Sequence, residues 1–227
     1  SKDYLYMNKT STNWGNWWGN AWVRASQGFN GYTGSESGDD LTMCLAGLPD
    51  FKTETSNDPG IPKLLENKWK SEGRYNQEVA ELNNFFSTSG LNRQVSNYQV
   101  KWLTDWVREY GVDGFRVDTA KHVQQDVWKT LKEQSVIALK EWKANNPDKA
   151  LDDLDFWMTG EAWGHGVSAS SSYFSNGFDS MINFGFQGVN ANMSSLETTY
   201  SNYANVINSS SSNVNYLSYI SSHDTSI

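Results

Sequence analysis

Five charged side chains follow or close short apolar segments of this sequence, where a buried strand would end. They are Arg116 and Asp118 in GFRVD, Glu161 in TGEAW, and His223 with Asp224 in SSHD. Two such carboxyl groups can work as a pair, in which one attacks an electrophilic carbon and the other, protonated, supplies a proton to the leaving group. An arginine beside the attacking carboxylate keeps that group ionised.

This set matches the needs of glycosidic bond cleavage with retention, in which two carboxyl groups stand about 5 to 5.5 Å apart. Each residue also has a purely structural interpretation. Arg116 and Asp118 could form an i, i+2 ion pair, Glu161 could cap the turn that follows it, and His223-Asp224 could begin a surface helix. Their joint occurrence at successive strand ends favours the catalytic interpretation.

The second half of the chain alternates between helical and strand patterns. Apolar residues at helical spacing predict a helix that ends at Gly111, a glycine suited to a C-terminal cap. The elements expected after it are a strand at Val112–Val117, a helix at Gln124–Asn146, strands at Phe156–Gly160 and Asp179–Phe186, a helix ending near Ile207, and a strand at Asn215–Ser222. This order predicts an α/β fold with a parallel sheet, whose functional residues gather at the carboxyl ends of the strands.

The first part of the chain, up to about Ser96, is rich in Gly, Asn, Ser and Asp and predicts long loops with short elements. One helical stretch is expected within Ile61–Phe86. Eleven Trp and eleven Tyr are unusual for a chain of modest hydrophobicity, and several stand among amides, as in NWGNWWGNAW. These rings could pack in a core or face the apolar side of a sugar, and composition leaves both open.

Charge and length exclude several classes of protein. The net charge of −8 and three scattered histidines disfavour nucleic acid and anionic membranes as partners. No apolar run reaches the roughly 18 to 20 residues of a membrane span. The single Cys44 excludes an internal disulfide and leaves the compartment open. A start without methionine and an end just after a strand lead us to expect a fragment of a longer protein.

Four segments, in order along the chain, resemble motifs of the α-amylase family of glycoside hydrolases. They are GLPDFK at Gly47–Lys52, GFRVDTAKH at Gly114–His122, GEAW at Gly160–Trp163 and SSHD at Ser221–Asp224. The segments DDLTM, KALDD and TGEAWGHG most resemble those of periplasmic or secreted α-amylases of Gram-negative bacteria, which act on maltodextrins. The resemblance implies a periplasmic or secreted protein whose partner is an α-glucan.

The resemblance also implies a fold and a division into domains. Residues 96–227 would be the central part of a TIM (β/α)8 barrel, about strands 4 to 7 with their helices. Residues 1–95 would be the irregular, loop-rich domain B inserted after barrel strand 3. The family motif at the end of strand 3 is missing from Ser1–Asp50, as are the first three strands and the eighth. We therefore expect the isolated chain to be inactive, and to be unstable, self-associated through its open barrel edges, or complemented by other segments.

The resemblance assigns a catalytic or binding role to a residue only where its position matches a motif of the family. The resemblance implies Asp118 as nucleophile, Glu161 as general acid and base, and Asp224 as the carboxylate that holds the sugar hydroxyls. It implies substrate contacts from Arg116, which positions the nucleophile, from His223 at the cleaved glucose, from Lys121 and His122 on the leaving-group side, and from Trp163. The pair Lys121-His122 resembles α-1,4-acting members.

A structural Ca²⁺ is also implied. Its ligands would be the backbone carbonyl of His122, the side chain of Asp50, and Asp40 or Asp39 as a further oxygen donor. Asp50 could instead be a turn residue after Pro49. His165 matches no catalytic position of the family and is expected to be a loop histidine near the cleft.

The same catalytic set leaves two other functions open. An α-glucosidase or a 4-α-glucanotransferase uses the same carboxylates, because either water or a second sugar can intercept the covalent intermediate. A non-catalytic carbohydrate-binding relative is the third alternative. An Asp118→Asn substitution separates these classes, since an enzyme loses turnover and keeps binding, whereas a binding protein has no turnover to lose.

Overall fold

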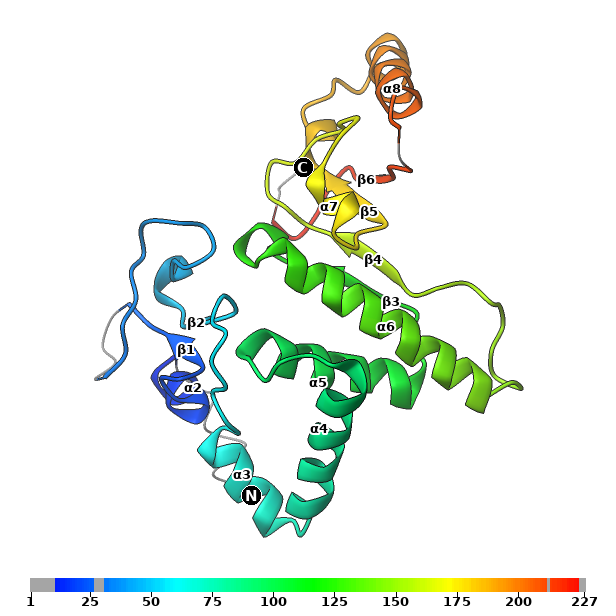
Figure 1. Ribbon diagram of the computed structural model, residues 1–227. Helices are drawn as coiled ribbons and strands as arrows, with labels where there is room; N and C mark the ends of the chain where they lie inside the picture. Colours follow the sequence, from blue (N-terminus) through cyan, green and yellow to red (C-terminus); the bar gives the residue numbers. More distant parts are fainter. Residues whose placement is uncertain (1–10, 27–30, 212, 225–227) are drawn as a thin grey trace. The chain divides into compact units, whose positions relative to one another are not determined.

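The computed structural model describes residues 11–26, 31–211 and 213–224 of the chain (Figure 1). Contacts between Cα atoms divide the chain into two compact units, residues 1–102 and 103–227. Helix α5 (Val95–Tyr110) contains the point of division.

Short elements and long loops make up the first unit, as its composition predicted. Helix α2 covers Ser11–Trp18, and the 3-10 turn η2 covers Leu45–Gly47. Strands β1 (Val23–Arg24) and β2 (Asp50–Phe51) pair in antiparallel fashion, so that Arg24 lies opposite Asp50. Two helices, α3 (Lys63–Ser71) and α4 (Tyr75–Ser89), precede α5.

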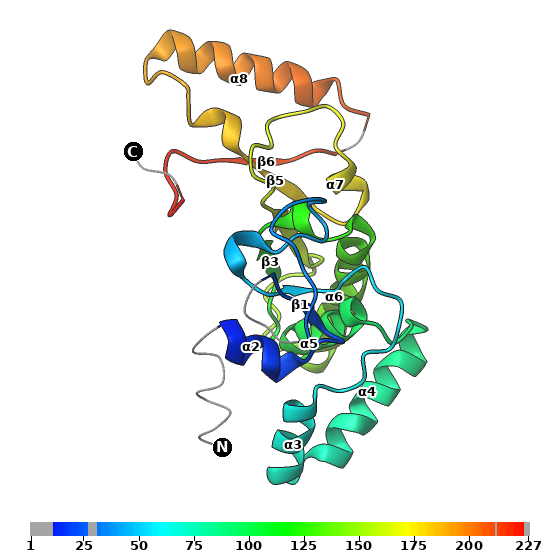
Figure 2. The same cartoon turned by 90° about the vertical axis from the view of Figure 1, so that its left-hand side faces the viewer.

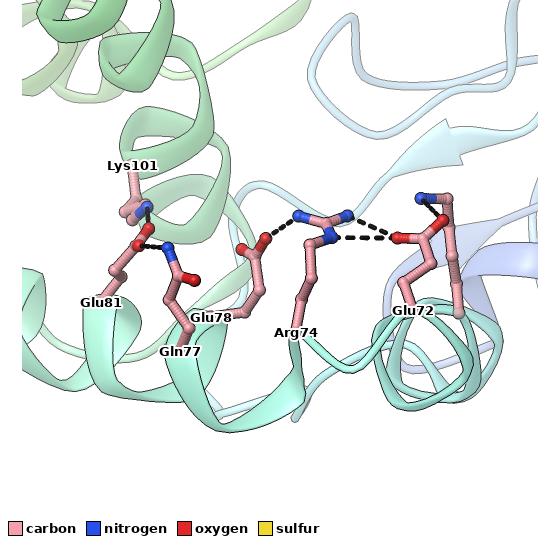
Figure 3. Close-up of polar contacts among 7 residues, drawn as sticks. Glu72, Arg74, Gln77, Glu78, Glu81 and Lys101 are labelled. Carbon is pink, nitrogen blue, oxygen red and sulfur yellow. Dashed lines mark hydrogen bonds and ion pairs between the residues drawn. The ribbon is translucent and has the colours of Figure 1, made fainter.

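The single helical stretch expected within Ile61–Phe86 is therefore two helices. The chain breaks at Gly73, whose φ of 72° lies in the left-handed region that glycine adopts without strain. Across the break the guanidinium of Arg74 contacts Glu72 at 2.8 Å and also pairs with Glu78 in the first turn of α4 (Figure 3). The helical pattern of the sequence is continuous here, and the glycine determines where the direction changes.

Aromatic side chains form the core of the first unit. Trp22 is 1% exposed, stacks on Trp102 at 5.6 Å, and donates its indole N–H to the carbonyl of Gly60 at 3.0 Å. Trp18 packs against both Trp22 and Phe51. Of the two interpretations of the tryptophan-rich segment, the structure favours core packing for Trp18 and Trp22.

The second unit contains a four-stranded parallel sheet in the order β3-β4-β5-β6, which confirms the predicted parallel sheet. The strands are β3 (Gly114–Val117), β4 (Trp157–Gly160), β5 (Ser180–Asn183) and β6 (Tyr216–Ser218). Each is shorter than the strand that the apolar pattern predicted. The strand expected at Asp179–Phe186 ends at Asn183, because the Asn183 side chain accepts from the Gly185 N–H at 3.0 Å and begins the 3-10 turn η4 (Phe184–Phe186).

Helices connect these strands in sequence. The 3-10 turn η3 (Ala120–His122) and helix α6 (Gln125–Asn145) join β3 to β4, the short helix α7 (Ser172–Ser175) lies between β4 and β5, and α8 (Met193–Asn208) lies between β5 and β6. Helix α6 buries Leu131, Ala138 and Leu139. Helix α8 has no buried residue and stands beyond the β5–β6 end of the sheet in both views (Figures 1 and 2).

Parallel strands joined by helical crossovers fit part of a (β/α) barrel. The expected helix Gln124–Asn146 and the helix ending near Ile207 are confirmed to within one residue at those ends. Within the part of the chain that the structure describes, no helix has the length and apolar character needed to cross a membrane.

Candidate active site

Two backbone hydrogen bonds hold the ends of β3 and β4 together beyond the sheet. The Glu161 N–H donates to the Val117 carbonyl at 2.8 Å, and the Ala120 N–H donates to the Glu161 carbonyl at 2.7 Å. Asp118 and Glu161 therefore leave adjacent strands at the same edge. Thr119, which directly follows Asp118, has a φ of 50°. A non-glycine residue in this region costs about 1 to 3 kcal/mol, and such strain gathers at functional sites.

Arg116 connects the first two candidate carboxylates. Its Nη1 lies 3.0 Å from Oδ2 of Asp118, and its Nη2 forms an ion pair with Oε2 of Glu161. The side chain of Glu161 is 9% exposed and that of Asp118 is 62% exposed. The i, i+2 ion pair that the sequence allowed is therefore present. It is part of a larger arrangement, because one guanidinium reaches carboxylates from two strands.

The third candidate carboxylate comes from the turn after β6. There the ring Nε2 of His223 lies 3.0 Å from Oδ2 of Asp224, and both residues lie in a turn. A cavity of about 210 Å³ collects all three carboxylates. Its lining residues are Asp118, Thr119, Lys121, His122, Glu161, Trp163, His223 and Asp224. Seven of these eight are residues that the sequence singled out, and they come from the ends of three parallel strands.

A second hollow of about 250 Å³ has Glu161, His223 and Asp224 in common with the first and adds an apolar wall. Phe184 and Tyr219 contribute rings to this wall, and Trp163 packs on Phe184 at 5.0 Å. Burial raises the pKa of Tyr219, and the charge of Asp224 adds to that effect. Sequence reasoning missed Thr119, Phe184 and Tyr219. For Phe184 the available sign was an aromatic residue directly after an apolar strand.

His165, expected near the cleft, lies in the same loop as Trp163 but lines neither hollow. Its ring is half-buried between Tyr173 and Tyr216, at centroid distances of 5.7 and 5.9 Å. Desolvation lowers the pKa of His165 below its ordinary value. His165 therefore packs between elements of the second unit.

Of the three residues predicted to bind calcium, two lie in the first unit and one in the second. Asp40 and Asp50 belong to the first unit, and His122 lines the cavity in the second. The Asp50 carboxylate lies 2.8 Å from Nη1 of Arg24, a buried guanidinium that also pairs with Glu54. Among the described residues no group of three or more His, Cys, Asp or Glu side chains could hold a metal ion. The Asp50 carboxylate is paired with Arg24, and its role as a calcium ligand stays a prediction.

Comparison with known proteins assigns the chain to a family. Residues 66–226 match the family model described as "Alpha amylase, catalytic domain". The periplasmic alpha-amylase of Escherichia coli strain K12 is 44% identical over 227 positions, which cover 98% of this chain and 30% of that protein. An alpha-amylase of Streptomyces lividans is 37% identical over 83 residues, which cover 36% of this chain and 8% of that protein. The chain thus spans less than a third of the length of these relatives.

Solved structures give weaker likenesses. An alpha-amylase from Geobacillus thermoleovorans, complexed with acarbose, is 16% identical over 82% of this chain and 32% of its own, with a TM-score of 0.45. An Anoxybacillus alpha-amylase is 21% identical over 49% of this chain and 24% of its own, with a TM-score of 0.37. Scores this low add no argument, and the assignment rests on the sequence match over most of the chain. The chain belongs to the family of alpha-amylase catalytic domains.

Proposed function

We propose that this chain supplies the central part of the catalytic domain of a retaining α-amylase, which hydrolyses internal α-1,4-glucosidic bonds of starch and maltodextrins. One observation carries the proposal. Carboxylates from three strand ends, Asp118, Glu161 and Asp224, line a single cavity, and Arg116 pairs with the proposed nucleophile Asp118. Family membership supports the same chemistry.

The proposed reaction has two steps. Asp118 attacks the anomeric carbon, and as its carboxylate forms the new C–O bond, the glycosidic C–O bond breaks and Glu161 gives its proton to the leaving oxygen. Glu161 then takes a proton from water. The water oxygen bonds to the same carbon and releases Asp118. The 62% exposure of Asp118 leaves it open to a sugar, and Glu161, although its side chain is only 9% exposed, lines the same cavity and can meet first the leaving oxygen and then the water.

The remaining lining residues are proposed to bind the glucan. Asp224 and His223 would hold hydroxyl groups at the cleaved glucose, since each offers a hydrogen-bonding atom to the cavity. Trp163 is 59% exposed and presents an indole ring suited to the apolar face of a pyranose. Lys121 and His122 are placed on the leaving-group side by analogy with the family.

We also propose, from the resemblance, that residues 1–95 correspond to domain B and 96–227 to the central barrel. The two-stranded sheet and long loops of the first unit support the former. A periplasmic or secreted location is proposed from the E. coli relative. Self-association through open barrel edges remains a prediction. Calcium is general in the family, but Asp50 pairs with Arg24 here, so no step of the proposed reaction passes through calcium.

A reducing-sugar assay on soluble starch with added Ca²⁺ tests the proposal. It is run on this chain and on a longer polypeptide that restores the rest of the relative's catalytic domain. We expect turnover from the longer polypeptide and none from the chain alone, with loss of turnover on Asp118→Asn. Product analysis on maltoheptaose separates endo-hydrolysis from exo-cleavage and transfer. Absence of turnover from both polypeptides would overturn the proposed activity.

A further inference from the structure

His165 connects the loop of the proton donor to two other elements of the second unit. Its backbone N–H donates to the Ala162 carbonyl at 2.9 Å, which closes a turn directly after Glu161. Its backbone carbonyl accepts the Phe184 N–H at 2.9 Å, at the exit of β5. Phe184 in turn packs on Trp163. The two backbone bonds of this one residue therefore fix the loop that carries Glu161 and Trp163.

Contacts of the imidazole ring add to these two backbone hydrogen bonds in holding His165 in place. It stacks on Tyr216 of β6 with an interplanar angle of 26°, and it meets Tyr173 of α7 edge-on. Nε2 lies 3.1 Å from the Ser171 hydroxyl. The Tyr216 hydroxyl is itself fixed, because it donates to the Ser168 carbonyl at 2.8 Å. The ring is therefore held by an aromatic pair and one hydrogen bond.

The hydrogen bonding of this ring suits only its neutral form. Nδ1 of His165 is buried and has no hydrogen-bond partner among the described residues, whereas Nε2 has Ser171. A neutral ring needs one N–H donor, which Nε2 can supply to the Ser171 oxygen. A protonated ring needs two acceptors, and its buried Nδ1–H would have none. An unsatisfied buried charged donor is strongly unfavourable.

The surroundings of the ring offer no compensation for a positive charge. The titratable groups that face it are Tyr173 on α7 and Tyr216 on β6, and the described residues give it no carboxylate partner. On its own loop the polar contact is the neutral Ser171. The lowered pKa of His165, caused by desolvation, agrees with this geometry. Acidification must therefore either leave the ring neutral or displace it.

We propose that His165 is a positioning residue for Glu161: its neutral ring fixes the turn after β4, and protonation releases that turn and the proton donor with it. The role of Glu161 as donor rests on the proposed function above. The release itself is a property of the fold and needs no substrate. It would set an acid limit to activity that does not come from the catalytic carboxylates.

The test is an NMR titration of the 227-residue chain, which has three histidines, His122, His165 and His223. The His165 ring signal is identified by its loss in His165→Gln, and its midpoint is compared with those of two reporter amides. These are the Glu161 N–H, which donates to Val117, and the Ala120 N–H, which donates to Glu161. We expect both amides to shift with the midpoint of His165, which lies below its ordinary value, and to lose that component in His165→Gln.

His165→Phe is the matched control, because it keeps a ring between the two tyrosines and removes both the titration and the Ser171 contact. It should remove from the Glu161 and Ala120 amide shifts the component that follows the His165 midpoint. The proposal is overturned if these amides do not respond to the His165 midpoint, or if the response persists in either variant. Because the readout needs no turnover, failure here is distinguishable from failure of the starch assay.

Discussion

Lys132 on α6 should be a main support of the strands that carry the site. Its ammonium lies 2.6 Å from Oδ2 of Asp179 and also contacts the Phe156 carbonyl, just before β4. The same Oδ2 accepts the Met158 N–H of β4 at 2.7 Å. One charge pair therefore holds helix α6, the start of β4 and the residue before β5. The side chains of Lys132 and Asp179 are 17% and 27% exposed.

Replacing Lys132 by Met removes the charge and keeps most of the stem. A hydrogen bond to a charged group is worth about 1.5 to 3 kcal/mol when a partner is left behind. Asp179 retains some solvent and the Met158 N–H, so we expect a loss of about 2 kcal/mol, roughly a 30-fold change in the unfolding equilibrium. Lys140→Met on the same helix is the matched control. The Lys140–Asp155 pair is 3.0 Å long but 64% and 57% exposed, and should contribute 0 to 1 kcal/mol.

Urea unfolding measures the change in stability of the whole chain. Hydrogen exchange of the Met158 amide is measured as well, because this amide reports the stability of the second unit alone. A double-mutant cycle with Asp179→Asn isolates the pair from the loss of each side chain. Equal losses from Lys132→Met and Lys140→Met, or a coupling energy near zero, would refute the argument that burial decides the strength of these two ion pairs.

Four further outcomes are expected. Gly160→Ala should lower the free energy of unfolding by about 1 to 3 kcal/mol through overpacking, since a Cβ would lie 2.7 Å from the sulfur of Met181. Gly166→Ala, which has open space around the added Cβ, should change the unfolding free energy little in the same urea assay. Asp118→Asn in the longer polypeptide should abolish starch hydrolysis and keep maltoheptaose binding by calorimetry, and retained turnover would remove Asp118 as nucleophile. Burial lowers the pKa of His165 from its ordinary 6.5, so just below pH 6.5 the unfolded state binds more protons than the folded state. The thermal midpoint of the chain should therefore fall as the pH drops below 6.5. The thermal midpoint of His165→Gln should depend less on pH over the same range. Burial raises the pKa of the Cys44 thiol, so a thiol reagent should react slowly until denaturant opens the first unit, and fast reaction of the native chain would contradict its 1% exposure.

The sequence was a good guide to the second unit. Apolar segments of strand length between helical patterns predicted a parallel sheet, because a buried parallel strand is apolar on both faces. The charged residues at the segment ends then had to meet at one edge, since all carboxyl ends of parallel strands lie there. The cavity lined by Asp118, Glu161 and Asp224 bears out this convergence.

Boundaries were less well predicted where side chains compete with the backbone pattern. β5 stops at Asn183 because its amide caps the next turn, and the expected helix before Phe86 divides at Gly73 because only glycine adopts that φ freely. Both features depend on local chemistry that hydrophobic periodicity does not contain.

By itself, the sequence determined the order of the elements, the family, and the residue types at the strand ends, because these follow from apolar periodicity and short motifs. Only the tertiary structure decided which groups become partners. It placed Arg116 between two carboxylates, gave Asp50 to Arg24, and enclosed His165 between two tyrosine rings. Such pairings depend on which strands and helices lie side by side, and residues far apart in the chain carry no local sign of it.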